Sequence, residues 1–140
     1  MQFLGQTTTI YVTNQELAKH FYTEILGYDL VRDVQLTDKF RYVSICPPSH
    51  PEQEIGLFSC DDAGVGVSKE TGKKMFELVE ASAFSVGVIK TDNCVEVCEN
   101  LRAQGVRVYA DPVAKAWGVV EVIILDDSGN RIAITSPHTD

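Results

Sequence analysis

The chain has 140 residues, 44% of them hydrophobic, with a formal net charge of −8 and a pI of about 4.8. This length suits one domain with its own core. The acidic balance argues against nucleic acid, because phosphate contacts need clustered Lys and Arg, and against anionic membrane surfaces. No apolar run is long enough to span a bilayer, and the N-terminus has neither a basic region nor a signal-peptide core. We therefore expect a cytoplasmic protein.

The cysteines do not form a framework of disulfides or metal ligands. No CxxC occurs in the chain, which argues against a zinc ribbon or a thioredoxin-like motif. We expect four free thiols, mostly buried: Cys46, Cys60, Cys94 and Cys98.

The first half of the chain predicts a strand, a helix and three further strands. Residues 7–12 are rich in β-branched side chains and suit a strand. Thr13 begins a capping box with Glu16, so a helix should start there, and Gly27 should end it. Apolar side chains recur at four-residue spacing on one face of this helix: Leu17, Phe21 and Ile25. Three extended segments follow: residues 28–35, 40–46 and 54–59.

The second half repeats this plan. Residues 84–90 suit a strand, Thr91-Asp92 can cap a helix, and Gly105 should end it. The apolar face of the helix should consist of four residues: Cys94, Val97, Cys98 and Leu101. Three strands complete this half: residues 106–109, 119–125 and 131–135. The recurrence of one pattern at equal spacing indicates two copies of a strand–helix–three-strand unit.

The domain organisation follows from these two copies. We expect one domain, residues 1–140, with a first module at about 5–60, a linker at 61–82 and a second module at about 83–137. The start of the linker is rich in glycine and charge, which predicts an exposed loop. Residues 73–80 could add one or two helical turns.

Two stretches carry a resemblance to a known family. The first consists of residues 10–14 and the helix end at residues 21–28. The second consists of Trp117-Gly118 and residues 126–134. In the latter, Gly129 and Asn130 are expected to supply positive φ for a tight hairpin. These stretches resemble the vicinal-oxygen-chelate superfamily of glyoxalase I, bleomycin-resistance proteins and extradiol dioxygenases. The resemblance implies an α+β fold of two βαβββ modules that form a curved, barrel-like mixed sheet around a cavity. It also implies a homodimer.

The resemblance also implies where a metal would be held. Metal-dependent relatives take one ligand from the first strand and one from the last strand of each copy, usually His, Gln or Glu. Counted from the shared motifs, these positions hold four residues without strong donors: Thr7, Gly56, Val86 and Ala133. Such side chains cannot together hold a divalent ion. A shifted register offers only Glu54 and Gln6 as fallback donors, and His20, His50 and His138 suit the surface. We expect no cofactor, with a divalent metal as the open alternative.

Several side chains are candidates for binding or catalysis. Three share one face of the first strand by alternation: Thr7, Thr9 and Tyr11. Arg41 either clamps a carboxylate or phosphate of a ligand or pairs with nearby acids on the outer face. Trp117 either offers a flat apolar surface to a ligand or packs a dimer contact. Glu121 is either outward and solvated or inward, where it would be the best general base in the chain.

Three functions stay open on this basis. The first is metal-free binding of an apolar or aromatic small molecule, similar to the bleomycin-resistance branch, in a trough lined by Thr7, Thr9, Tyr11, Arg41 and Trp117. The second is a glyoxalase-like enzyme, a lyase or dioxygenase, with rearranged ligands such as Glu54, Glu121, Gln6 or a cysteine. The third is a non-catalytic interaction module whose cavity is filled by its own side chains, such as Phe58, Phe84 and Ile123.

Overall fold

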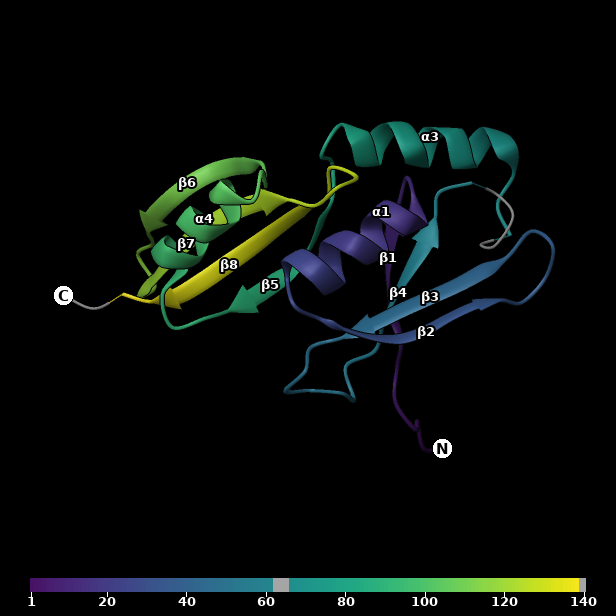
Figure 1. Cartoon of the computed structure of the whole chain (residues 1–140), viewed down its shortest axis with the longest axis horizontal. Coiled ribbons are helices and arrows are strands. Elements are labelled where there is room, and N and C mark those ends of the chain that lie inside the picture. The colour runs from purple at the N-terminus through teal and green to yellow at the C-terminus, as the bar shows by residue number, and fades with distance from the viewer. Residues whose placement is uncertain (62–65, 139–140) are drawn as a thin grey trace. The chain divides into compact units, whose positions relative to one another are not determined.

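The computed structural model describes residues 1–61 and 66–138 of the chain (Figure 1). It divides into two compact units, Met1–Val79 and Glu80–Asp140. The start of the expected linker loop, at residues 62–65, lies outside the described residues. No helix in the described part of the chain has the length and apolar character needed to cross a membrane.

The first unit contains one four-stranded mixed sheet. Its elements are β1 (Thr8–Val12), α1 (Gln15–His20), the π-helical turn η1 (Phe21–Ile25), β2 (Asp29–Gln35), β3 (Arg41–Cys46), β4 (Ile55–Ser59) and α3 (Lys69–Glu80). The strand order is β1-β4-β3-β2, with β1 parallel to β4 and the other neighbours antiparallel. The helix α3 is longer than the one or two turns expected within residues 73–80.

The first helix begins one residue later than the capping box predicts. Asn14, not Thr13, is the N-cap: its backbone is extended and its side-chain oxygen accepts a hydrogen bond from the Leu17 N–H at 3.0 Å. The expected apolar face is also displaced. Leu17 is 58% exposed, whereas Ala18, Phe21 and Tyr22 are buried, because the face that meets the sheet runs at i, i+3 and i+4 from Ala18.

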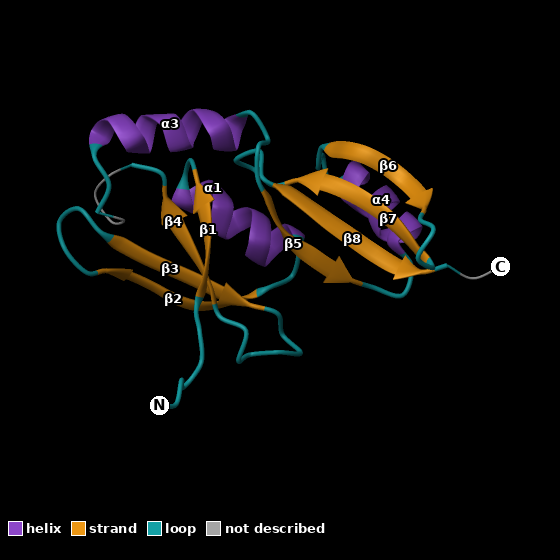
Figure 2. Cartoon of the chain, turned by 180° about the vertical axis from the view of Figure 1, so that it is seen from behind, coloured by secondary structure: helices purple, strands orange, loops and turns teal. Residues whose placement is uncertain are grey.

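The core of the first unit lies between its sheet and α1. Alternate strand residues are buried on this side: Ile10, Val12, Val43, Ile45 and Leu57. The Gln15 side-chain amide fixes the helix to the sheet by donating to the backbone carbonyls of Arg41 at 2.9 Å and Leu57 at 2.8 Å. In Figures 1 and 2, α1 lies across one face of this sheet. Side chains on the opposite face therefore have no cover from α1.

The second unit repeats the architecture (Figure 2). Its elements are β5 (Ser85–Lys90), α4 (Cys94–Ala103), β6 (Val108–Ala114), β7 (Val119–Leu125) and β8 (Arg131–Pro137), in the sheet order β5-β8-β7-β6. The helix buries Cys94, Cys98 and Leu101, as its periodicity predicts. Its N-cap is Asn93, whose side chain accepts from the Glu96 N–H, rather than the expected Thr91-Asp92.

The strand β6 extends five residues beyond the expected end at Tyr109. It contains Pro112, which has no N–H and breaks a central strand. An edge strand tolerates proline, and β6 pairs only with β7, in a register that shifts at Ala110 and Val113.

The class is α+β with two βαβββ modules, as predicted. Its eight strands form two four-stranded mixed sheets rather than one closed sheet. All four cysteines are free and buried, which confirms the expectation for the thiols.

A buried carboxylate organises the hairpin between β7 and β8. Asp126 is 1% exposed, and its Oδ1 accepts the backbone N–H groups of Ser128, Gly129 and Asn130, each at 2.9 Å. Gly129 has a φ of 110°, as the turn requires, but Asn130 does not have positive φ. Asn130 instead donates its side-chain amide to Asp126 Oδ2 at 3.0 Å. This side-chain contact, rather than backbone freedom, explains the asparagine.

Asp126→Ala should lower the free energy of unfolding by about 3 kcal/mol, since hydrogen bonds to a buried charge are strong and their loss leaves buried N–H groups unpaired. Asp126→Asn keeps an acceptor at Oδ1 and should cost clearly less. Urea unfolding of the two variants and the wild type measures both effects. A loss below about 1 kcal/mol in the alanine variant would contradict this role for the turn.

Candidate functional site

The candidate site of the first unit lies on the sheet face opposite α1, which we call the open face. Thr9 and Tyr11 are exposed there, and they alternate along β1 with the buried Ile10 and Val12, which face the helix. The open face continues from β1 through β4 to β3, because Thr9 pairs with Gly56 and Gly56 pairs with Ser44. Thr7 precedes β1 and reaches the same face through its hydroxyl contact to Glu54.

Glu54 is the centre of a polar cluster on the open face. Its carboxylate accepts hydrogen bonds from the hydroxyls of Ser44 at 2.7 Å, Thr7 at 3.3 Å and Tyr42 at 3.4 Å. The Arg32 Nε lies 3.9 Å from Glu54 Oε1. Glu54 thus takes its partners from β2, β3 and the segment before β1. The sequence suggested Glu54 only as a fallback metal ligand and did not point to Tyr42, Ser44 or Arg32. The available signal was strand alternation, which places Tyr42 and Ser44 on the same face of β3.

A pocket of about 310 Å³ opens beside this cluster. Six residues line it: Thr7, Arg32, Val34, Leu36, Tyr42 and Glu54. Its volume lies at the lower end of the range for small-molecule sites. The lining combines one carboxylate and one guanidinium with apolar side chains, which is a composition suited to a small organic molecule.

Gly56 sits where the resemblance puts a metal ligand, and the space over it is filled by an aromatic ring. A Cβ at Gly56 would lie 2.8 Å from the Phe58 ring. That ring packs at 5.4 Å from the ring of Tyr42 and 5.9 Å from that of Phe40, between ring centres. The position therefore carries no donor, and Phe58 lies over the backbone that a donor side chain would leave.

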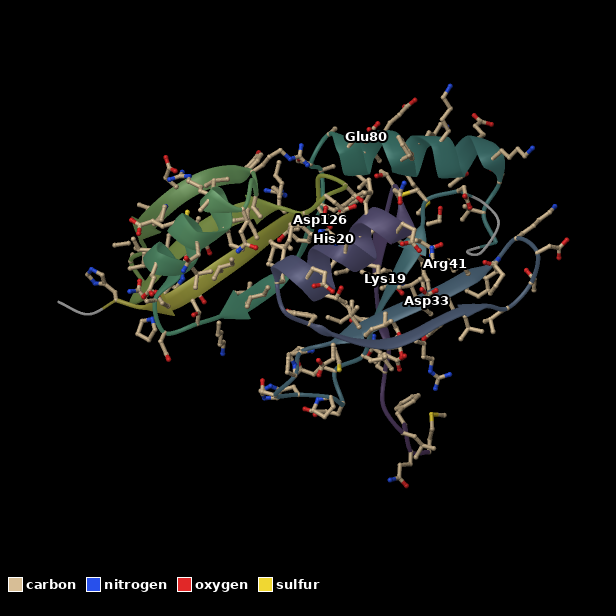
Figure 3. The ribbon with its side chains drawn as sticks, in the orientation of Figure 1. Lys19, His20, Asp33, Arg41, Glu80 and Asp126 are labelled. Atoms are coloured by element: carbon tan, nitrogen blue, oxygen red, sulfur yellow. The ribbon has the colours of Figure 1, made fainter. Side chains whose placement is uncertain are left out.

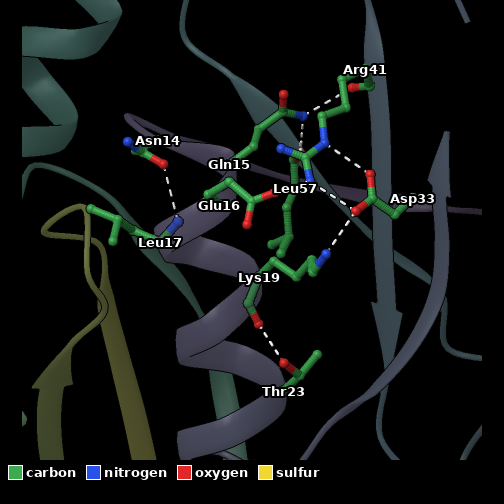
Figure 4. A network of polar contacts seen from close by, with 9 residues as sticks. All are labelled: Asn14, Gln15, Glu16, Leu17, Lys19, Thr23, Asp33, Arg41 and Leu57. Carbon is green, nitrogen blue, oxygen red and sulfur yellow. Dashed lines mark hydrogen bonds and ion pairs between the residues drawn. The ribbon is translucent and has the colours of Figure 1, made fainter. Parts of the chain in front are cut away.

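Arg41 faces α1 rather than the open face (Figure 4). Its guanidinium donates to both carboxylate oxygens of Asp33 at 2.8 Å and also contacts Glu16 on the helix. Lys19 adds a further ion pair to Asp33 at 2.8 Å, and Figure 3 locates these residues within the unit. The Arg41 guanidinium, followed by Lys19, holds the pKa of Asp33 well below its usual range. Of the two expectations for Arg41, the structure has the pairing with acids.

A second pocket of the first unit has a volume of about 230 Å³. Its lining includes Gln15, Gln35, Lys39 and Arg41 together with Phe40 and Phe58. The Gln15 amide and the Arg41 guanidinium in this pocket are engaged in holding α1 to the sheet.

In the second unit, Glu121 and Trp117 are brought together by a lysine. Glu121 is half-buried on the sheet face opposite α4, and the Lys115 Nζ lies 3.5 Å from its Oε1. The same Nζ lies 5.9 Å from the centre of the Trp117 ring. Trp117 is 72% exposed in the turn before β7. Glu121 is therefore neither solvated and unpaired nor an isolated buried base.

In the second sheet Ala133 pairs with Val88, because the β5–β8 register shifts between Ser85 and Val88. Gly87, with a φ of 152°, lies at this irregularity. Val86, the expected first-strand position, lies two residues before Val88, and neither valine carries a metal donor.

The donor set in the two units does not fit a metal with three or four protein ligands. Within residues 1–61 and 66–138, no three His, Cys, Asp or Glu side chains gather as a metal site would require. Glu54 is the fallback donor with a defined place on the open face, whereas Gln6 is exposed ahead of β1. The three histidines are exposed, as expected: His20, His50 and His138.

Asp127 is a titratable group that sequence reasoning missed. Burial, with a smaller contribution from the neighbouring Asp126, raises the pKa of Asp127 to about 6. Its Oδ1 is buried without a hydrogen-bond partner, while its Oδ2 accepts from the Ser128 hydroxyl at 3.1 Å. The adjacent pair of aspartates in the sequence was the signal, because two close carboxylates oppose each other's ionisation.

Comparisons with known proteins agree with the geometry. The model of the Glyoxalase/Bleomycin resistance protein/Dioxygenase superfamily matches residues 4–134. The chain is 31% identical over 129 residues to the uncharacterized protein YurT of Bacillus subtilis (strain 168), covering 91% of this chain and 94% of that protein.

Solved structures show the same fold. The crystal structure of UcmS2 superposes with a TM-score of 0.86 at 30% identity, covering 96% of this chain and 98% of that one. The crystal structure of TnmS3, an antibiotic binding protein from Streptomyces sp. CB03234, gives a TM-score of 0.69 at 22% identity, covering 99% of this chain and 100% of that one. The chain belongs to the Glyoxalase/Bleomycin resistance protein/Dioxygenase superfamily.

Proposed function

We propose that this protein binds an apolar or aromatic small molecule without a metal, and that the ligand contacts the open face of the first unit. The observation that carries this proposal is the replacement of a metal donor by Gly56 and the Phe58 ring. An aromatic surface at this position favours the rings of an organic ligand over a metal ion. The exposed Thr9 and Tyr11 and the pocket beside Glu54 supply further contacts.

The relatives support a binding role. TnmS3 is described as an antibiotic binding protein, and it shares this fold. By analogy, the ligand here would be held by shape and by a few polar groups, without a chemical step. We propose a cytoplasmic homodimer as the working form, because relatives of this length usually pair.

The competing proposal is an enzyme, a lyase or dioxygenase, with rearranged metal ligands such as Glu54, Glu121, Gln6 or a cysteine. The two carboxylates already have partners within their own units, three hydroxyls for Glu54 and Lys115 for Glu121. Coordination by either carboxylate would have to displace these partners and would need two or three further ligands. The binding proposal needs no such rearrangement.

Metal analysis separates these two proposals. Protein purified without chelator should hold well under 0.1 equivalents of zinc, nickel, iron or manganese, and EDTA should leave its thermal midpoint unchanged, since structural and catalytic metals stabilise the state that binds them. Elemental analysis by mass spectrometry and a melting curve measure these outcomes. Stoichiometric metal that Glu54→Ala releases would favour the enzyme.

Variants on the two faces of the first sheet should behave differently. A ligand would be found by thermal shift against a library of apolar and aromatic compounds. Tyr42→Ala, on the open face, should weaken its binding by about tenfold, because an aromatic contact is lost. Arg41→Ala, on the helix face, should leave the dissociation constant unchanged and lower stability by about 1 kcal/mol. Calorimetry and urea unfolding give both quantities, and an equal loss of binding in the two variants would contradict the proposed face.

Trp117 offers an internal probe, since it is the chain's single tryptophan. If its exposed ring stacks on the ligand, a saturating ligand should change the emission intensity of the wild type by about a quarter or more. If the ring packs a dimer contact instead, the emission should change with protein dilution in the absence of ligand. Fluorescence titration and dilution measure the two alternatives separately, and a response to neither would remove Trp117 from both roles.

A further inference from the structure

We propose that Glu54 selects ligands that carry a protonated amine, so that the pocket of the first unit is a cation subsite within the proposed ligand-binding face. This inference rests on the proposed function and adds the chemical class of the ligand. Its basis is the arrangement of charge and aromatic rings around one carboxylate, all of it within the first unit.

The Glu54 carboxylate is held in place before any ligand arrives. Hydroxyl donors from Ser44, Thr7 and Tyr42 fix both of its oxygens. Oε1 contacts Ser44, Tyr42 and Arg32, whereas Oε2 accepts one hydrogen bond among the described residues, from Thr7 at 3.3 Å, and a carboxylate oxygen can accept two. A positioned anion in a partly apolar pocket attracts a donor of positive charge more strongly than a neutral hydroxyl.

Arg32 is the cation nearest to this carboxylate, and it is loosely held. Its Nε lies 3.9 Å from Glu54 Oε1, at the limit of an ion pair, and its side chain is 65% exposed. Exposed ion pairs of this length contribute little, so a ligand ammonium can replace Arg32 while the guanidinium turns into solvent. Arg32 therefore acts as a weak competitor for the subsite.

The aromatic side chains favour the same ligand. The Tyr42 ring lies in the pocket wall and packs against Phe58 at 5.4 Å. The faces of such rings attract ammonium groups, while Val34 and Leu36 cover apolar carbon atoms beside them. The net charge of −8 adds a long-range attraction for cations.

Two-dimensional NMR of the isotope-labelled full chain tests this inference with three probes of similar shape: phenethylamine, 2-phenylethanol and 3-phenylpropanoate. The amine should bind with a dissociation constant about tenfold lower than that of the alcohol, and the carboxylate should bind most weakly. The amide signals of Thr7, Tyr42 and Glu54 should shift most. Glu54→Gln should remove the preference for the amine, and Arg32→Gln should increase it.

Glu52→Gln is the matched control, because Glu52 is an exposed carboxylate in the same loop and its change removes the same charge. It should keep the preference for the amine. Equal binding of amine and alcohol to the wild type would overturn the cation subsite and leave the proposed binding function standing. A preference that survives Glu54→Gln or is lost in Glu52→Gln would overturn the role of Glu54. If no probe shifts any signal on the open face, the proposed function falls and the subsite falls with it.

Discussion

Each sheet of this protein packs one face against a helix, α1 in the first unit and α4 in the second, and this packing decides which strand residues form the apolar core. Side chains that alternate along a strand face either the helix or the other side. In β1, Ile10 and Val12 meet the helix while Thr9 and Tyr11 stay exposed. The Glu54 cluster lies on the face away from α1, where Ser44 is buried beneath it.

The strand β4 carries an aromatic ring at the position where the family resemblance puts a metal ligand. Gly56 leaves a space that the Phe58 ring fills, and that ring joins Phe40 and Tyr42 in an aromatic cluster. Two residues before Gly56, Glu54 is surrounded by hydroxyls, not by other metal donors. The same short segment therefore carries both an apolar surface and a positioned charge, which together suit an organic ligand.

Charge on the helix side has a different role. Arg41, Asp33, Lys19 and Glu16 form a network that ties α1 to β2 and β3. The Gln15 amide adds two hydrogen bonds to backbone carbonyls of the sheet. A basic residue in an alternating strand can point to either face, and here the Arg41 guanidinium pairs with Glu16 on α1 and Asp33 on β2.

The sequence alone determined the elements and their repetition, because hydrophobic period, caps and turn residues are local signals. It also predicted that Thr7, Thr9 and Tyr11 share a face, since alternation within one strand is fixed. It did not determine that Asn14 and Asn93 cap the helices, which face Arg41 takes, or where the register of β5 and β8 shifts. Those outcomes depend on contacts between segments far apart in the chain: acids on α1 and β2, and an irregular pairing of β5 with β8. The cluster around Glu54 likewise needs three strands in register, which only the tertiary structure supplies.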